Sequence, residues 1–299
     1  MTKTTSYIVA IIVLLAMNLA LFFNVGGTKR KTDVTFLDAT ALSQLERISI
    51  RNNQQEIVLQ ASGEGWILND KYAVDRSFMN TLLSVLERIQ VVREVGNWEE
   101  SELGSIELGF ASNTNFQFHF AANGTRTKSY FITNGLAKEV VVPGYRDNVV
   151  DIFMMHPDQW RDRLVFDGSW RSIQKLEVKR GSEEPLKIVF EDQFFMVNGE
   201  APQDSSAVVE YLNQFQYFEA NERISDGRFP RFDSLAQTTP GAVITIEDIK
   251  EEQPVILTIF PNLKGQAYHL VMRENQMMVI DARRVQGLLP TPQDFLRKN

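Results

Sequence analysis

The three histidines are the residues of this 299-residue sequence whose type could most directly do chemistry. His119 lies in the segment FQFHF, on the strand face opposite to its Phe neighbours, His269 lies similarly in AYHLV, and His156 precedes a proline. A zinc site needs histidines at a helical spacing such as i, i+4, or accompanied by carboxylates in a ligand pattern. None of the three is placed in this way, so we expect surface or strand-face histidines and no metal site.

Carboxylates occur in short runs that could supply acid and base groups. A glycosidase needs two of them facing each other across a cleft, one with a raised pKa. The runs lie in loop-like or strand-end contexts, which are typical of solvated turns, so the sequence predicts no catalytic residue. They comprise Glu99, Glu100 and Glu102; Glu183 and Glu184; and Glu247, Asp248, Glu251 and Glu252.

Other chemistries are excluded by composition. The chain has no cysteine, so disulfides, thiolate nucleophiles and iron–sulfur clusters are ruled out. No phosphate-cradling G-x-x-x-x-G-K-[ST] motif, dinucleotide turn or G-x-S-x-G elbow is present, so we expect no cofactor. The net charge of −7 disfavours nucleic acid as a partner.

Aromatic and charged segments have structural interpretations. Asn123-Gly124-Thr125 fits a glycosylation sequon, but Asn-Gly between alternating segments is a strong tight-hairpin signal. The stretch from Trp160 to Arg163 (WRDR) predicts an ion-paired corner that docks the two halves of the chain. We expect core packing rather than a partner groove for a set of aromatic residues: Phe194, Phe195, Phe215, Tyr217 and Phe218.

The amino-terminal segment predicts a membrane helix. Residues 6–25 are 20 uncharged, mostly apolar residues, which as a helix would span roughly 30 Å, the thickness of the hydrocarbon core. A cleaved signal peptide is the alternative, but Leu21, Phe22 and Phe23 are bulky where small residues would be needed. We therefore expect an uncleaved anchor that contacts membrane lipid through residues 6–25.

Charge leaves the orientation of this anchor open. Lys3 precedes it and Lys29, Arg30 and Lys31 follow it, a small excess that favours a cytoplasmic carboxyl side. Residues 32–299 carry 27 basic and 38 acidic side chains, a net charge of −11. Such a body is repelled by anionic lipid, so the helix must supply the attachment.

An internal repeat is the most informative pattern in the body. LERISIRNNQQEIVLQ (45–60) and IQKLEVKRGSEEPLKIVF (173–190) both alternate apolar and polar residues, as half-buried strands do. Trp66 then matches Phe195, and Asn69 matches Asn198, at a shift of 129 residues. Asp75 and Asp204 stand at matching helix N-cap positions, each before apolar residues at helical spacing.

Each copy continues with further strands and a similar tail. Residues 116–132 and 139–142 form the later strands of the first copy, and the second copy has about one strand more. Short turns between neighbours predict antiparallel sheets, so the fold class is α+β, with helices on one face of each sheet. We expect an anchor with its basic flank at 1–31, a first repeat at 32–166 and a second repeat at 167–299.

The LERISI strand, the Gly65-Trp66 strand before the Asp75 helix, and Trp160-Arg161-Asp162-Arg163 resemble the DUF 4340 domain family. The family pattern has Lys where this chain has Arg163. The resemblance implies a bacterial protein, anchored in the inner membrane by a single pass, with a periplasmic body. It also implies a relation to accessory domains of gliding-motility ABC-type transporters, and it brings no catalytic residues.

The sequence thus predicts a non-enzymatic membrane protein that binds protein partners, as a scaffold or accessory subunit of an ABC-type export or gliding-related complex. The alternative is a membrane-tethered hydrolase or binding protein for cell-wall glycan or peptide. It would use carboxylates between the repeats, and we would expect two opposed Asp or Glu in a concave pocket.

Overall fold

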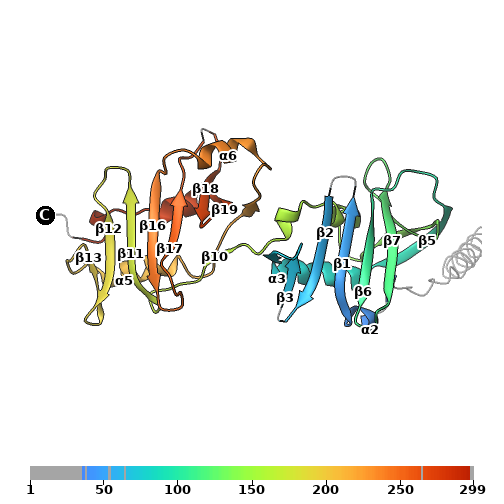
Figure 1. The fold of residues 1–299 in the computed structure, drawn as a ribbon, viewed down its shortest axis with the longest axis horizontal. Coiled ribbons are helices and arrows are strands. Elements are labelled where there is room, and N and C mark those ends of the chain that lie inside the picture. Colours follow the sequence, from blue (N-terminus) through green and yellow to red (C-terminus); the bar gives the residue numbers. More distant parts are fainter. Residues whose placement is uncertain (1–35, 38, 53–54, 64, 264, 297–299) are drawn as a thin grey trace, which may run out of the picture. The chain divides into compact units, whose positions relative to one another are not determined.

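The computed structural model describes residues 36–37, 39–52, 55–63, 65–263 and 265–296 (Figure 1). The predicted anchor at 6–25 and the whole segment 1–31 lie outside these residues. Within the described ranges, none of the helices has the length and apolar character needed to span a bilayer.

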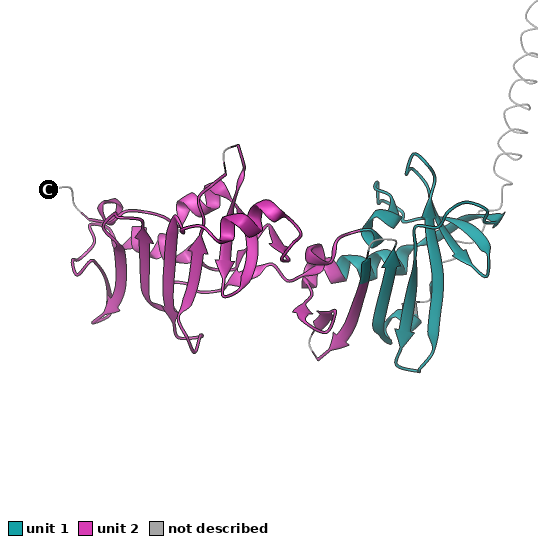
Figure 2. Cartoon of the chain, turned by 45° about the horizontal axis from the view of Figure 1, so that its top comes forward, with its two compact units in different colours: residues 1–56, 80–154 teal, residues 57–79, 155–299 magenta. Residues whose placement is uncertain are grey.

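The chain folds into two compact units (Figure 2). One comprises residues up to 56 together with 80–154, and the other comprises residues 57–79 and 155–299. The elements are mostly antiparallel strands with helices between them, which confirms the α+β class.

The first sheet has nine strands in the order β4-β3-β2-β1-β6-β7-β8-β9-β5. The strand β5 pairs with β9 through two register shifts, at Val91/Arg93 and at Glu94/Gly96. The bounds are β1 Leu45–Asn52, β2 Gln55–Ser62, β3 Gly65–Leu68, β4 Tyr72–Ala73, β5 Gln90–Asn97, β6 Gly104–Phe110, β7 Asn115–Ala122, β8 Ser129–Thr133 and β9 Leu136–Val141.

The second large sheet has eight strands in the order β13-β12-β11-β16-β17-β18-β19-β15. The strands β10 (Leu164–Phe166) and β14 (Phe218–Glu219) pair with each other in a separate two-stranded antiparallel sheet. The bounds are β11 Ile173–Arg180, β12 Leu186–Glu191, β13 Phe194–Val197, β15 Glu222–Ile224, β16 Ala242–Asp248, β17 Val255–Ile259, β18 Tyr268–Arg273 and β19 Gln276–Asp281.

The two sheets have the same strand order once β4 is set aside. The match extends to register, because Ile48 pairs with Leu108 in the first sheet as Leu176 pairs with Ile246 in the second. A register shift also falls at matching points, Leu45/Arg47 in β1 and Ile173/Lys175 in β11.

Asn69 and Asn198, matched in the sequence, make the same local contacts. Both adopt a left-handed backbone, at φ 50° and 49°, which Asn tolerates better than most residues. The Asn69 side-chain oxygen accepts the Val58 amide at 2.7 Å, and that of Asn198 accepts the Lys187 amide at 2.8 Å. Each Asn therefore closes the turn after β3 or β13 onto the preceding strand.

Helices α3 (Arg76–Arg88) and α5 (Ser205–Asn213) start at the predicted caps. Asp75 accepts the Phe78 amide at 2.9 Å, and Asp204 accepts the Ser206 amide at 2.8 Å. Their apolar faces are buried, with Leu82 and Leu212 at 1% and 0% exposure. The remaining helices are α2 Ala39–Leu42, α4 Val149–Phe153, α6 Pro230–Ala236, α7 Ala282–Gly287 and the 3₁₀ turns η1 Pro157–Trp160 and η2 Pro292–Asp294.

Helices cover both faces of the second sheet, so the expectation of helices on one face is wrong there. Along β19, Met278 and Ile280 join the core that includes α5, whereas Met277 and Val279 join a second cluster with Phe232 of α6. Successive residues of a strand point to opposite faces, so α6 packs on the other side. The segment from Pro230 carries few helix signals besides its proline.

Two further sequence predictions are corrected. The first sheet also has the strand that seemed extra in the second, because Gly104–Phe110 forms β6 despite its glycines. The Asn123-Gly124 segment does join two paired strands, but as a longer loop. The Asn123 side-chain oxygen accepts the Thr127 and Lys128 amides, both at 2.8 Å, which closes residues 123–128 instead of a two-residue turn.

Candidate functional site

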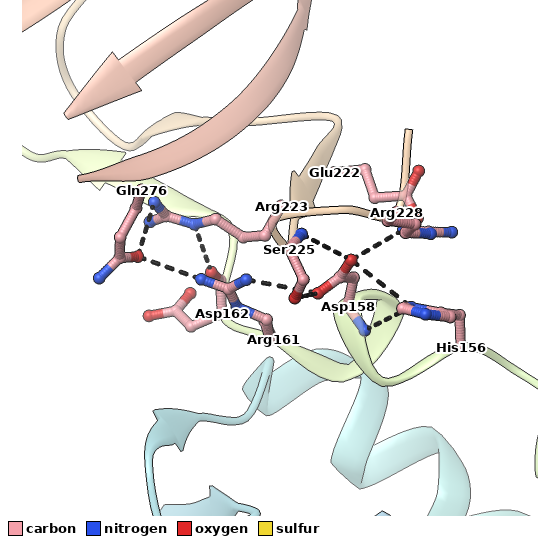
Figure 3. A network of polar contacts seen from close by, with 9 residues as sticks. All are labelled: His156, Asp158, Arg161, Asp162, Glu222, Arg223, Ser225, Arg228 and Gln276. Carbon is pink, nitrogen blue, oxygen red and sulfur yellow. Dashed lines mark hydrogen bonds and ion pairs between the residues drawn. The ribbon is translucent and has the colours of Figure 1, made fainter. Parts of the chain in front are cut away.

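A network of charged side chains lies within the second unit, where the segment 156–163 meets β15 (Figure 3). The 3₁₀ turn η1 begins at Pro157, whose ring suits the first helical position. His156 caps this turn, and the Gln159 side chain accepts the His156 amide at 2.9 Å. The segment thereby places Asp158 and Arg161 toward residues 222–228.

Asp158 is the centre of this network. Its carboxylate has no exposed surface, and it accepts the backbone amide of Ser225 at 2.9 Å as well as the Ser225 hydroxyl. Two guanidinium groups complete its surroundings, Arg228 at 3.1 Å and Arg161 at 3.3 Å. A buried carboxylate is stable only when its oxygens are satisfied in this way.

The pKa values of Asp158 and His156 both lie below their ordinary values. Burial would raise the pKa of Asp158, but the hydrogen bonds from Ser225 and the charges of His156 and Arg228 outweigh it. Burial, and then the charge of Arg228, lower the pKa of His156. The neutral imidazole is therefore favoured, and its Nδ1 accepts the Asp158 amide at 3.2 Å.

Arg161 and Arg223 share one neutral acceptor. Both donate to the side-chain oxygen of Gln276, at 3.2 and 3.4 Å. Arg223 also donates to the backbone oxygens of Asp162 and Leu164. Burial and the like charge of Arg161 lower the pKa of Arg223, and within the described residues it forms no ion pair with a carboxylate.

The other end of the segment is joined to residues just before α3. Arg163 donates to Asp75 at 2.9 Å, and the Asp75 amide donates to the Trp160 carbonyl at 2.8 Å. Trp160 is fully buried with its ring 4.6 Å from that of Phe78, edge to face. These contacts confirm the ion pairs predicted for the stretch from Trp160 to Arg163.

The network engages its charged groups with one another and with the backbone. Asp158 has four donors and no exposed surface, so its carboxylate is not presented to a substrate. The arrangement holds the segment 156–163 in place, a structural role. Sequence reasoning missed the partners Glu222, Arg223, Ser225, Arg228 and Gln276, which are more than 50 residues away along the chain and follow no local pattern.

In the part of the chain that is described, no histidine belongs to a group of three or more His, Asp or Glu side chains that could hold a metal ion. His119 Nδ1 lies 2.6 Å from the Glu102 carboxylate, a pairing the sequence did not predict. His269 Nδ1 lies 3.0 Å from the Phe260 carbonyl oxygen. Each imidazole thus has a local partner in the fold.

The acidic runs are spread over separate turns. Glu99 and Glu100 precede β6, Glu183 contacts Arg180 at 2.9 Å, and Glu251 contacts Arg273 at 3.4 Å. Asp248 is the exception to the solvated-turn prediction, because it is buried and accepts the Ser172 hydroxyl at 2.7 Å. The carboxyls with a displaced pKa in the described residues, Glu139, Asp158 and Asp204, all have it lowered, opposite to a general acid.

The aromatic set is divided between core and surface. Phe195, Phe215 and Phe218 are buried as predicted. Phe194 and Tyr217 are each 69% exposed, so core packing is wrong for these two. Phe194 follows a left-handed turn at Asp192 and Gln193, and Tyr217 itself has φ 47°, so the local backbone directs both side chains outward.

Comparison with known proteins finds no matching family model, no matching curated protein and no matching solved structure. The resemblance to DUF 4340 domains stays a prediction made from the sequence motifs.

Proposed function

We propose that this chain is a non-enzymatic, single-pass membrane protein whose body acts as a scaffold or accessory subunit. Residues 6–25 anchor it in a bacterial inner membrane, and the body faces the periplasm. Its partners are proteins of an ABC-type export or gliding-related complex, as the DUF 4340 resemblance implies.

The observation that carries the proposal is that the charged side chains of the network contact other groups of the fold and are not presented to a substrate. Asp158 forms ion pairs with Arg161 and Arg228 in the second unit, and it also accepts the backbone amide of Ser225. Catalytic acids and bases need access to a substrate within hydrogen-bond reach. The network instead stabilises one conformation of the segment 156–163, which suits a body that presents surfaces to other proteins.

The repeated strand order supports the same proposal. We infer that the body, from 32 to 166 and from 167 to 299, is a duplicated unit, because strand order, register and the position of the bulge agree. Exposed Phe194 and Tyr217 offer aromatic contact surface of the kind that protein interfaces use.

Purification of the full-length chain in mild detergent tests the proposal. We expect an ABC-type permease, its ATPase or another envelope subunit to elute with the chain in a fixed ratio. The double variant Phe194→Ser/Tyr217→Ser should weaken this association, and Ile249→Ser, which alters another exposed apolar side chain, is the matched control. A chain that elutes alone in gentle conditions contradicts the proposal, and a reporter fused at the carboxyl terminus tests the orientation.

A further inference from the structure

A cavity of about 380 Å³ lies beside the network, within the second unit. This volume is near the lower end of the roughly 300–1,000 Å³ typical of small-molecule sites. Lys71, Tyr72, Arg161, Asp226 and Gln276 are among its lining residues.

One wall of the cavity carries fixed hydrogen-bond donors. The Arg161 side chain is only 5% exposed, and its guanidinium lies 3.8 Å from the Tyr72 ring centroid. Arg161 and Arg223 both donate to the Gln276 side-chain oxygen, so that oxygen points inward, and the amide nitrogen makes no hydrogen bond among the described residues. Donors held in place before a ligand arrives are favourable for binding, because little freedom is lost.

Two cations line this wall, Lys71 and Arg161. The guanidinium of Arg161 lies 3.3 Å from the buried Asp158 carboxylate, and behind the wall Arg228 is shared between Asp158 and Glu222. Lys71 adds an ammonium 4.7 Å from the Tyr72 ring centroid, and no carboxylate is paired with it in the described part of the chain. An anionic group of a ligand would be attracted to this wall.

The rim of the cavity carries the opposite charge. Asp226 and Glu274 line the cavity and are both exposed. Asp226 forms no ion pair among the described residues, and Glu274 reaches only Arg273, at 3.9 Å. These carboxylates would repel a polyanion such as a nucleotide, and they would attract an ammonium group.

We propose that this cavity binds a small zwitterionic ligand, a free amino acid or short peptide, with its carboxylate toward Lys71 and Arg161 and its ammonium toward Asp226. The proposal goes beyond the scaffold function and does not depend on it. Binding needs no reaction, and both charged ends of the ligand contribute.

Calorimetric titration of the full-length chain in detergent with the dipeptide alanyl-alanine tests the proposal. We expect a dissociation constant of about 1 mM or tighter. The amino-acetylated dipeptide and the carboxyl-amidated dipeptide each lack one charge, and each should bind about tenfold more weakly. Equal binding of all three, or no binding of the dipeptide, overturns the proposal.

Two exposed side chains allow variants that should still fold. Lys71→Met should weaken binding of the dipeptide about tenfold and leave the affinity for the amidated dipeptide unchanged. Asp226→Asn should also weaken binding of the dipeptide about tenfold, but it should leave the affinity for the acetylated dipeptide unchanged. Lys179→Met and Asp192→Asn are matched controls on exposed positions outside the cavity. If the cavity variants behave like these controls, the site is elsewhere and the proposal is wrong, whatever the co-purification experiment shows.

Discussion

Asp158 accepts two hydrogen bonds from Ser225, one from its backbone amide and one from its hydroxyl, across 67 residues of sequence. The pair joins η1 to the end of β15. Because the carboxylate also contacts two guanidinium groups, one side chain helps to position three other residues, Ser225, Arg161 and Arg228. We expect the stability of the second unit to depend on it.

Asp158→Asn should lower the free energy of unfolding by about 3–5 kcal/mol, because it leaves the buried Arg161 with a neutral partner and takes one of its two carboxylates from Arg228, which keeps Glu222. Urea unfolding followed by tryptophan fluorescence measures the effect. Glu252→Gln, on an exposed turn, is the matched control and should leave the midpoint unchanged. Equal midpoints for the two variants would contradict a central role for Asp158.

Stability should fall as the pH drops below about 6.5, the ordinary pKa of histidine. The folded state lowers the pKa of His156, so the unfolded chain takes up the proton first and the stability present above pH 6.5 is lost on acidification. His156→Gln should flatten this part of the profile relative to the parent chain. The same slope in the variant and the parent chain would show that another group titrates.

A second loss should follow at lower pH. The pKa of Asp158 is lowered in the folded state, so its contribution is complete above the ordinary value of 3.8 and disappears as the pH falls through the folded value. Thermal unfolding between pH 5 and about pH 2 measures it. In Asp158→Asn this acid-sensitive part should be smaller than in the parent chain, and an unchanged profile would argue against the assignment.

Asp75→Ala should destabilise the protein more than Asp204→Ala. Both residues cap a helix, but only Asp75 also accepts a guanidinium, that of Arg163 at 2.9 Å. We expect Asp75→Ala to cost about 1–2 kcal/mol, from the cap and the ion pair together. The melting temperatures of the two variants and of Arg163→Met separate the contribution of the helix cap from that of the ion pair. Equal shifts of the melting temperature for Asp75→Ala and Asp204→Ala would show that the ion pair does not contribute to stability.

Gly104→Ala should destabilise the first sheet by about 1–3 kcal/mol. A Cβ at this position would lie 2.2 Å from the Arg51 carbonyl oxygen and 2.6 Å from the Phe120 ring. Gly65→Ala is the matched control, because a Cβ there meets no atom within 4 Å. Urea midpoints compare the two variants, and a tolerated Gly104→Ala would mean that β1 and β7 move apart without cost.

The sequence predicted the elements whose own residues carry the signal. Alternation revealed β1 and β11, and the caps Asp75 and Asp204 revealed α3 and α5. Strand β6 was missed because Gly104 weakens strand propensity, although the sheet requires that glycine for close packing. The partners of Asp158 were missed because pairing across 67 residues is set by tertiary packing, which has no spacing rule.

The two bulges of β5 affect how readily the edge of the first sheet can pair with another chain at high protein concentration. A regular outer strand offers an even row of amide and carbonyl groups on which another chain can add, and bulges interrupt that row. In the described sheet β5 is the last strand, and its shifts at Val91/Arg93 and Glu94/Gly96 fall along most of its length. Removing both bulges would therefore give β5 a regular edge, on which strand addition and fibrillar aggregation can start.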